Sequence, residues 1–430
     1  MKKQILNRCT RRTFFAASAL GLAGLGTQGN ALLADEIPAV TDTSALDDVV
    51  ESFPCLQNPT GHSMNVLWTV KRPATGWVEY GRTEALGQIV RPAVCGLYPW
   101  VDRFLAIPIE NLLPNTTYFY RTVTVGMDFP RYAQIKSGTP IVSEIFSFRT
   151  PGPQSERGSF VVANDTHETP DVLNAATKRF AELNADYTIF NGDLAHDTNS
   201  ADQMVKATVL AGQTPFAATH PLLVAMGNHD HRGPWARNLE KLILPWQQDS
   251  RFRSLGRNFA LRQGPIALIG MDTGEDKPDT HPVWAGLSAF GPYRQLQTEW
   301  LAATLAQPEI ESAPFIVVFC HIPLFDDRPD ANPGNILEGY ASWQQDCAEA
   351  WAPLFQRHGV QAVIVAHEHR FRADAPCDGR SWLQVCGGGC NLQKDATLIH
   401  GQATSDKLTL TAEKLVDGSQ LGSWDLTPRS

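Results

Sequence analysis

The segment Pro221–His231 restricts the possible folds of this chain more than any other stretch. It reads Pro-Leu-Leu-Val-Ala-Met-Gly-Asn-His-Asp-His, so an apolar run stops abruptly at Gly227. A short apolar run that ends in this way indicates a buried strand, because Gly, Asn and Asp extend strands poorly. The polar residues then follow the carboxyl end of a strand, which is where open α/β sheets place their ligands.

Four other short apolar runs also lead directly into Asp, Asn or His. They are Ser159–Ala163, Tyr187–Phe190, Phe315–Phe319 and Ala362–Val365. The chemically active side chains just after the five runs are those of Asp165, His167, Asp193, Asn228, His229, Asp230, His321, His367 and His369. Five of the twelve histidines therefore follow predicted strands. The sequence predicts a single site built from these strand ends.

The part of the chain after the polar linker Pro151–Arg157 alternates between strand-like and helix-like patterns. Val172–Leu183 and Gln295–Leu305 have apolar residues at helical spacing, and each lies between predicted strands. Such alternation is typical of βα units with right-handed crossovers. We therefore expect an α/β domain over residues 158–426, with two sheets flanked by helices.

Residues 50–150 show no helical periodicity. Strand-like segments such as Asn65–Val70 and Tyr118–Val125 alternate with turns, which gives about seven short strands and predicts a β-sandwich domain. This domain is either a sugar-binding or surface-binding module or a structural support beside the cleft. The second role is favoured, because no cluster of exposed ligand-binding residues can be identified in it.

Length and charge limit the classes of function. At 430 residues the chain is long for one core, so about two or three domains are expected. The formal net charge of −9 offers no basic face for nucleic acid. A small phosphorylated substrate is compatible with this charge if bound metal ions supply the positive charge.

The first 34 residues are predicted to be a twin-arginine signal. Arg11 and Arg12 precede the apolar run Ala16–Leu25, which is too short to span a bilayer. Processing is expected near Ala31 or Ala34. The signal implies a periplasmic or secreted protein that is handled by the twin-arginine export machinery and has no transmembrane segment. An uncleaved anchor or a frayed basic N-terminus is the alternative.

Seven cysteines follow the predicted signal. Cys55 and Cys95 form a plausible disulfide within the upstream domain. The state of Cys377, Cys386 and Cys390 stays open between a pair among them and buried free thiols.

The donor residues suit a pair of metal ions. Two ions held about 3.5–4 Å apart need one carboxylate that bridges them and neutral N and O donors on either side. Asp193 is the natural bridge. The remaining donors divide into Asp165, His167 and His369 for one ion, and Asn228, His321 and His367 for the other. A lone histidine at a strand end is more often a core or surface residue, but the joint occurrence of these donors predicts a dinuclear centre.

These motifs resemble those of the calcineurin-like metallophosphoesterases. The resemblance covers Ser159 to about Leu426, and its motifs are Asp165-Thr166-His167, Gly192-Asp193, Gly227-Asn228-His229-Asp230, His321 and Ala366-His367-Glu368-His369. Cys320 and Ala366 stand where the family usually has glycine, which is not a ligand. The order of an upstream sandwich followed by this domain looks like that of the purple acid phosphatases, as do the segments Leu112–Tyr118 and Gln297–Leu301. This resemblance implies that the upstream region is a fibronectin III-like β-sandwich.

The resemblance implies a phosphoric ester hydrolase with two metal ions, which would be iron, zinc or manganese. A hydroxide on the dinuclear centre would attack phosphorus in line. His229 would protonate or hydrogen-bond the leaving-group oxygen, and Asp230 would orient the ring of His229. A helix N-cap is the alternative role for Asp230.

The chain departs from the purple acid phosphatases at two positions. Those enzymes owe their colour to a tyrosinate three residues after the bridging aspartate, and they have glycine at the histidine of Asp-x-His. Here the two positions hold His196 and His167. Neutral imidazole suits zinc, manganese or ferrous iron, so we expect His167 to be a ligand and His196 to lie beside a ligand or in solvent. Tyr187 lies at the far end of its predicted strand and cannot replace the missing tyrosinate.

The substrate is not readable from the sequence. Asp272–Arg294 and Leu324–Gln345 are expected to line the cleft, but their Pro, Gly, Trp and Asp residues do not distinguish phosphomonoesters from nucleotide or phospholipid-type diesters. A different class of function, a surface-binding protein with a degenerate catalytic domain, is disfavoured by the complete set of donors.

Overall fold

Two β-sheets packed face to face carry the predicted donor residues. The computed structural model describes residues 46–325 and 340–429, so the predicted export signal lies outside the described residues. The first sheet has nine strands in the order β21-β20-β19-β10-β11-β12-β1-β2-β5, and the second has six in the order β13-β14-β15-β16-β18-β17.

The strands after the linker alternate with helices, as predicted. In the first sheet these strands are β10 (Gly158–Ala163), β11 (Tyr187–Asn191), β12 (Leu222–Ala225), β19 (Thr397–Ala403), β20 (Leu408–Lys414) and β21 (Gln420–Leu426). The second sheet contains β13 (Phe259–Gln263), β14 (Ile266–Met271), β15 (Phe315–Cys320), β16 (Ala362–Val365), β17 (Arg372–Asp374) and β18 (Leu383–Cys386). Neighbouring strands β10, β11 and β12 run parallel, and so do β14, β15 and β16.

An apolar core fills the space between the two sheets. Phe160 of the first sheet and Phe319 of the second meet edge to face, with ring centroids 5.2 Å apart. Val162, Leu223 and Ile364 are buried in the same cluster. Because both faces of the central strands are covered, these strands are continuous apolar runs rather than alternating ones. The predicted two-sheet α/β fold is confirmed.

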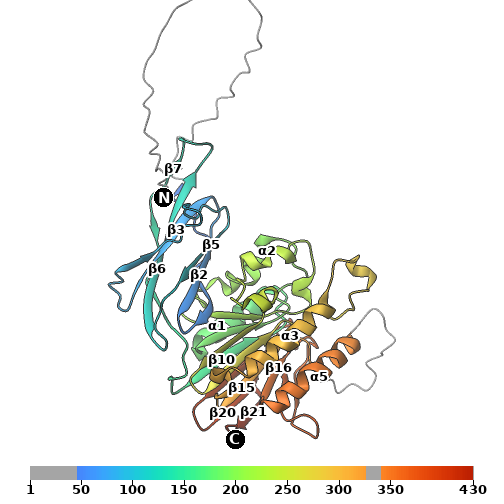
Figure 1. Cartoon of the computed structure of the whole chain (residues 1–430). Helices are drawn as coiled ribbons and strands as arrows, with labels where there is room; N and C mark the ends of the chain where they lie inside the picture. The colour runs from blue at the N-terminus through green and yellow to red at the C-terminus, as the bar shows by residue number, and fades with distance from the viewer. Residues whose placement is uncertain (1–45, 326–339, 430) are drawn as a thin grey trace, which may run out of the picture. The chain divides into compact units, whose positions relative to one another are not determined.

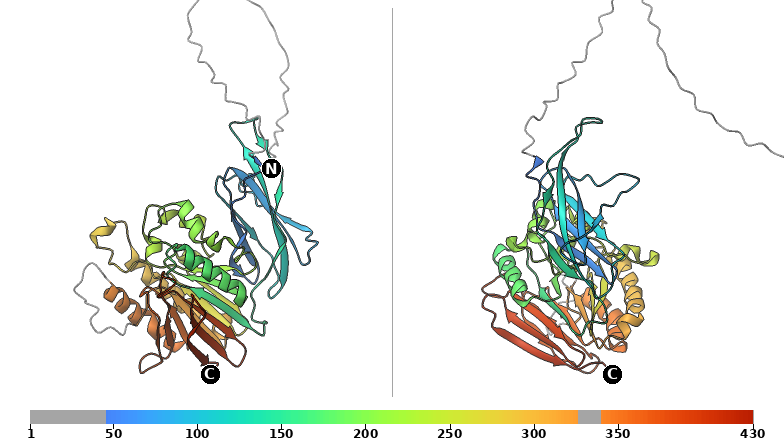
Figure 2. Two further views of the ribbon diagram at one scale, coloured as in Figure 1. Left: turned by 180° about the vertical axis from the view of Figure 1, so that it is seen from behind. Right: turned by 90° about the vertical axis from the view of Figure 1, so that its left-hand side faces the viewer.

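Helices cover the outer faces of both sheets. They are α1 (Pro170–Leu183), α2 (Ala201–Ala207), α3 (Phe290–Leu305), α4 (Pro308–Glu311) and α5 (Tyr340–Arg357). The apolar side of α1 packs on the first sheet, while α3 and α5 lie side by side on the second (Figures 1 and 2). Pro170 begins α1, and Asn184 ends it in the left-handed region with φ of 48°. In the described part of the chain, no helix is long and apolar enough to cross a membrane.

The upstream β-rich region shares a sheet with the rest of the chain. Its strands β1 (Cys55–Thr60), β2 (Ser63–Thr69) and β5 (Phe104–Ile109) extend the first sheet, because β1 pairs in parallel with β12. The strands β3 (Ala74–Gly81), β4 (Gln88–Val90), β6 (Thr117–Asp128), β7 (Lys136–Ser137), β8 (Ile141–Val142) and β9 (Phe146–Arg149) lie opposite. A core that includes Trp68 and Tyr120 lies between the two layers. The described residues group into one compact unit, so the limits at 50–150 and 158–426 stay predictions.

Buried hydrogen bonds fix this region to the segments that precede and follow β12. The Tyr120 hydroxyl donates to the carbonyl of Ala218 at 2.7 Å, and the backbone N–H of Leu56 donates to Ala217 at 2.8 Å. The side chain of Gln57 donates to Leu242 at 2.9 Å. The position of β1 beside β12 is therefore held by polar contacts as well as by strand pairing.

The predicted disulfide between Cys55 and Cys95 is wrong. Cys55 is a buried residue of β1, whereas Cys95 is exposed in the segment between β4 and β5, and none of the seven described cysteines is paired. Burial raises the pKa of Cys55 to about 12, so this residue is a neutral thiol of the core.

We expect Tyr120→Phe to lower the free energy of unfolding by about 1–3 kcal/mol, because the buried carbonyl of Ala218 loses its donor while the ring keeps its packing. Urea unfolding measures the effect. Tyr132→Phe removes a hydroxyl from a side chain that is 91% exposed and serves as the matched control. Equal effects of the two substitutions would contradict this interpretation.

Candidate metal centre

The carboxyl ends of five strands bring together all seven predicted metal ligands. The loops after β10, β11, β12, β15 and β16 meet at one edge of the two sheets. Four donors gather around one point, namely Asp165, His167, Asp193 and His369, and a second group contains Asp193, His321 and His367. The donor atoms within each group lie within 4.8 Å of one another. Asp193 is the residue that the two groups share, which is the geometry expected of a bridge.

The first group is tightly convergent. The Nε2 atoms of His167 and His369 are 3.1 Å apart. Nε2 of His167 is 3.7 Å from Oδ2 of Asp193, and Nε2 of His369 is 3.5 Å from Oδ1 of Asp165. Two imidazole nitrogens and two carboxylates therefore face a common point.

The second group adds the side chain of Asn228. Nε2 of His321 is 3.1 Å from Oδ2 of Asp193 and 3.7 Å from Oδ1 of Asp165. Oδ1 of Asn228 lies 3.0 Å from Nδ1 of His367. The residues present thus offer N and O donors on both sides of Asp193.

The hydrogen bonds of His321 test whether this cluster fits metal ions. Its Nδ1–H donates to the carbonyl of Asn191 at 2.9 Å, which leaves the lone pair on Nε2. Nε2 is fully buried and has no hydrogen-bond partner in the described structure, although it faces the carboxylate of Asp193. In the neutral ring, the Nε2 lone pair is repelled by this buried carboxylate unless a cation lies between them, and without metal a proton on Nε2 takes the place of that cation. The cluster therefore fits a metal site.

The charges of the cluster also indicate a site for cations. Burial raises the pKa of Asp165 well above its usual range. Burial would also raise the pKa of Asp193, but protonated His321, 3.1 Å away, outweighs the burial and lowers that pKa. Burial lowers the pKa of His321, yet Asp193 and Asp165 reverse this and raise it to about 10. The two buried carboxylates thus demand positive charge, which protonated His321 supplies without metal.

Two of the histidines are neutral donors. Burial lowers the pKa of His167 and that of His367 to about 3. Neutral imidazole is the form of histidine that binds metal, so these side chains need not lose a proton first.

The backbone at the cluster is strained. Left-handed φ angles occur at Asp165 (45°), His167 (43°), Asp193 (53°), His367 (69°) and His369 (51°). A residue other than glycine pays about 1–2 kcal/mol in this region, and such strain is concentrated at functional sites. The bends turn consecutive side chains from several strands toward one point.

Glycines allow the loops to approach each other closely. A Cβ atom on Gly192 would lie 2.4 Å from Nδ1 of His321, and one on Gly227 would lie 2.4 Å from Oδ1 of Asp193. A Cβ atom on Gly389 would lie 2.6 Å from Cγ of His369. The run of three glycines between Cys386 and Cys390 was the sequence signal for this last contact, which sequence reasoning missed.

The predicted role of Asp230 in orienting the His229 ring is wrong. One carboxylate oxygen of Asp230 accepts from the backbone N–H groups of Asp193 (3.0 Å) and Gly227 (2.9 Å), and the other accepts from Leu194 (3.0 Å). Nδ1–H of His229 donates instead to the carbonyl of His196. Asp230 therefore ties the loop after β11 to the loop after β12 and does not reach the ring.

His229 and His196 lie at the edge of the cluster. Nε2 of His229 is 3.9 Å from Oδ2 of Asp193, and its side chain is 26% exposed. The exposed ring of His196 stacks on the ring of His167 at 4.5 Å, with an angle of 27° between the planes. The hydroxyl of Tyr187 lies 3.4 Å from Oε1 of Gln263, at the opposite end of β11. Tyr187 is thus remote from the cluster.

A charged group beside His229 was not predicted. NH1 of Arg232 lies 2.9 Å from Nε2 of His229, and the guanidinium is paired with Glu275. Asp276 and Lys277 continue this group. The position of Arg232 three residues after His229 could have indicated a charge near this ring. Its acidic partners could not be found in this way, because they are more than forty positions away in the chain.

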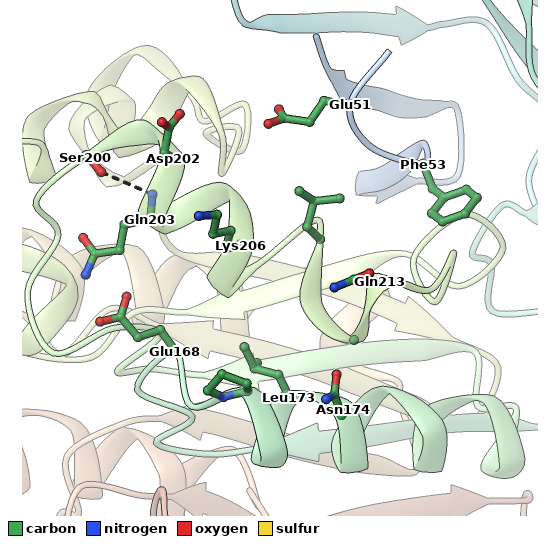
Figure 3. A pocket seen from close by; sticks show the side chains of 13 residues that line it. Glu51, Phe53, Glu168, Leu173, Asn174, Ser200, Asp202, Gln203, Lys206 and Gln213 are labelled. Atoms are coloured by element: carbon green, nitrogen blue, oxygen red, sulfur yellow. Dashed lines mark hydrogen bonds between the residues drawn. The ribbon is translucent and has the colours of Figure 1, made fainter. Parts of the chain in front are cut away.

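A separate cavity of about 930 Å³ is lined by residues of α1 and α2, by the loop before α1 and by Glu51 and Phe53 (Figure 3). None of the seven predicted ligands lines it. Its charged residues are Glu51, Glu168, Asp202 and Lys206. Since carboxylates predominate, this cavity is not suited to phosphate, and the phosphate site is expected at the mouth of the metal cluster.

Comparison with known proteins agrees with this geometry. The family model described as calcineurin-like phosphoesterase matches residues 158–371. This stretch is a calcineurin-like phosphoesterase domain. The match begins at β10 and ends just after His369, so it includes all seven donors of the cluster.

Relatives and solved structures agree with this family. Serine/threonine-protein phosphatase CPPED1 of Rattus norvegicus is 26% identical over 46% of this chain and 54% of its own length. Purple acid phosphatase 22 of Arabidopsis thaliana is 24% identical over 68% of this chain and 60% of its own length. The chain thus spans about half of each relative. Purple acid phosphatase PPD1 from yellow lupin seeds superimposes with a TM-score of 0.62 at 18% identity, over 87% of this chain and 74% of that one, which supports the fold.

We expect Asp193→Asn to remove both metal ions, because an amide cannot bridge two cations as a carboxylate does. The metal content per chain, measured by mass spectrometry after loading, should fall from two toward zero. Asp197→Asn changes an exposed carboxyl in the same loop and should leave the content unchanged. Two ions per chain in Asp193→Asn would show that the bridge lies elsewhere.

Iron-loaded protein should lack a tyrosinate charge-transfer band in the visible spectrum. The reason is that His196, and not a tyrosine, stands three residues after Asp193 and that the Tyr187 hydroxyl lies away from the cluster. A strong visible band in metal-replete protein that disappears when a tyrosine is replaced by phenylalanine would refute this expectation.

Proposed function

We propose that this protein is an exported dinuclear metal-dependent phosphoesterase that hydrolyses phosphate esters. The observation that carries the proposal is the pair of donor groups that share Asp193 inside a calcineurin-like phosphoesterase domain. The donor set of carboxylate, imidazole and amide suits iron, zinc or manganese.

Two bound cations would supply a strongly acidified water and positive charge for the phosphoryl oxygens. Asp165, His167, Asp193 and His369 would hold one cation, and Asp193, Asn228, His321 and His367 the other. Stabilisation of the leaving group would then be the task of protein side chains at the rim of the cluster. His229 is the best placed of these, since its Nε2 is close to Asp193 and its side chain is reached by solvent.

His229 is oriented for contact with a leaving group. The carbonyl of His196 holds Nδ1–H, so Nε2 faces the mouth of the cluster. From this position it can donate a hydrogen bond or a proton to the leaving-group oxygen once it is protonated. The ring does not belong to either donor group, which separates its role from metal binding.

A phosphomonoester is favoured over a diester as the substrate. The two relatives described above are named as phosphatases, and a purple acid phosphatase shares the fold. The proposed export rests on the paired arginines and the apolar run of the N-terminal segment, and it places the enzyme in the periplasm or outside the cell.

Hydrolysis by metal-loaded protein tests the proposal. We expect turnover of p-nitrophenyl phosphate that is lost on chelation and restored by iron, zinc or manganese, and slower turnover of bis(p-nitrophenyl) phosphate. Two bound ions without hydrolysis of either ester would instead favour a surface-binding protein with a degenerate catalytic domain. Fusion of residues 1–34 to a reporter tests the export signal separately.

His229→Ala should lower turnover by about 10²-fold or more on alkyl phosphates, while two metal ions stay bound. The loss should be smallest on p-nitrophenyl phosphate, because its leaving group needs no proton. His62→Ala, an exposed histidine in the turn between β1 and β2, is the control. Equal losses on good and poor leaving groups would exclude this role for His229.

A further inference from the structure

We propose that Arg232 binds a non-bridging oxygen of the phosphate group of the substrate. The proposal deepens the proposed phosphoesterase function, because it assigns a residue that recognises the phosphate in addition to the metal ions. It rests on the position, the hydrogen bonds and the exposure of the guanidinium group.

Arg232 reaches the mouth of the metal cluster. It directly follows the short helical turn η3 (His229–His231), so it leaves the same loop as Asn228. Its NH1 atom is 2.9 Å from Nε2 of His229, and that nitrogen is 3.9 Å from Oδ2 of Asp193. The Arg232 side chain is 22% exposed, so a ligand from solvent can reach it.

Most of the N–H groups of Arg232 are already used. Nε–H donates to Oε2 of Glu275 at 2.8 Å, and NH2 donates to Oε1 of Glu275 at 2.6 Å and to Oδ1 of Asp276 at 3.2 Å. These bonds fix one edge of the planar group in the two-pronged manner typical of arginine and carboxylate.

The NH1 group is left for another acceptor. A neutral His229 can accept one N–H, at Nε2. The other ring nitrogen, 3.3 Å from NH1, already carries the proton that it donates to His196. Within residues 46–325 and 340–429, therefore, one N–H of NH1 has no acceptor suited to it. This N–H is at the edge of the cluster where an anionic oxygen would lie.

Glu275 makes the arrangement rigid. Its side chain is fully buried, and Lys277 lies 3.6 Å from Oε1 of Glu275 and 2.7 Å from Oδ1 of Asp276. Two cations and two carboxylates therefore balance in charge, so the group is stable without a bound anion. A purely structural ion pair would be complete with the edge facing Glu275, and it gives no reason for NH1 to lie against His229.

Binding of phosphate would also affect His229. A phosphoryl oxygen that accepts from NH1 would take the place of Nε2 of His229 as its partner. Nε2 would then be free to face the leaving group. Arg232 would in this way couple recognition of the phosphate to release of the neighbouring ring.

The test compares Arg232→Ala and Arg232→Lys with Arg179→Ala. Arg179 of α1 pairs with Glu182 of the same helix and with Glu413 of β20, and it provides a matched ion-pair control. In Arg232→Ala we expect KM for p-nitrophenyl phosphate to rise by about tenfold or more, with a smaller fall in kcat and two metal ions still bound. Arg232→Lys should show an intermediate loss, because it keeps the charge without the fixed fork.

Binding of inorganic phosphate gives a second readout that does not depend on turnover. Calorimetry on metal-loaded protein should show weaker phosphate binding by about tenfold in Arg232→Ala, and by less in Arg232→Lys and Glu275→Gln. If the unaltered protein hydrolyses no ester, the proposed function fails, but the phosphate titration still decides the role of Arg232.

Two results would overturn the inference. One is unchanged phosphate affinity in folded, metal-loaded Arg232→Ala, and the other is the absence of phosphate binding by the unaltered protein. If Arg232→Ala does not fold, Arg232→Lys decides, and a phosphate affinity equal to that of the unaltered protein counts against the proposal.

Discussion

The burial of two carboxylates side by side is the constraint on which the rest of this structure depends. Asp165 and Asp193 are almost completely removed from solvent, and both face Nε2 of His321. A buried unpaired carboxylate costs several kcal/mol, so this arrangement persists only if cations or protons compensate it. Neutral histidines converge on the same two residues, and each neutral ring offers a lone pair on one nitrogen, so the surroundings of the two carboxylates suit a metal cation.

Asp230 makes the shared carboxylate possible without being a ligand. It collects three backbone N–H groups from the loops after β11 and β12. The side chain of Asp193 in turn accepts the backbone N–H of His229 at 2.9 Å. The orientation of Asp193 and the entry of the chain into His229 are thus set by the same small network. His229 at the rim and Asp193 at the centre are therefore positioned by the same contacts, which fix the distance between their side chains.

Much of the site could be predicted from the sequence because each ligand is placed by the strand directly before it. Each ligand follows an apolar run, and the carboxyl ends of parallel strands meet at one edge, so the position of Asp165 or His321 in the chain predicts its position in space. Contacts that depend on distant segments were not readable. The pairing of β1 with β12 and the pairing of Arg232 with Glu275 have no periodic signal. The rejected disulfide failed for a related reason, since spacing in the sequence does not reveal that Cys55 faces a core and Cys95 faces solvent.

Several ligands lie in the left-handed region of φ, where glycine would be free of strain. Glycine adopts these φ angles freely, but it offers no donor atom, so a position that must both turn the chain and bind an ion accepts the strain. The surrounding contacts hold the bends: the backbone N–H of His167 donates to Asp193 at 2.9 Å, and that of Glu168 donates to Leu194 at 2.7 Å. The neighbouring residues Gly192 and Gly227 are glycines because the side chains of His321 and Asp193 lie too close to them for a Cβ atom. Strain, buried charge and close packing are therefore concentrated in the same few loops, and a bound ion would relieve the charge and stabilise the bends together. The conformation of these loops would therefore be coupled to metal binding.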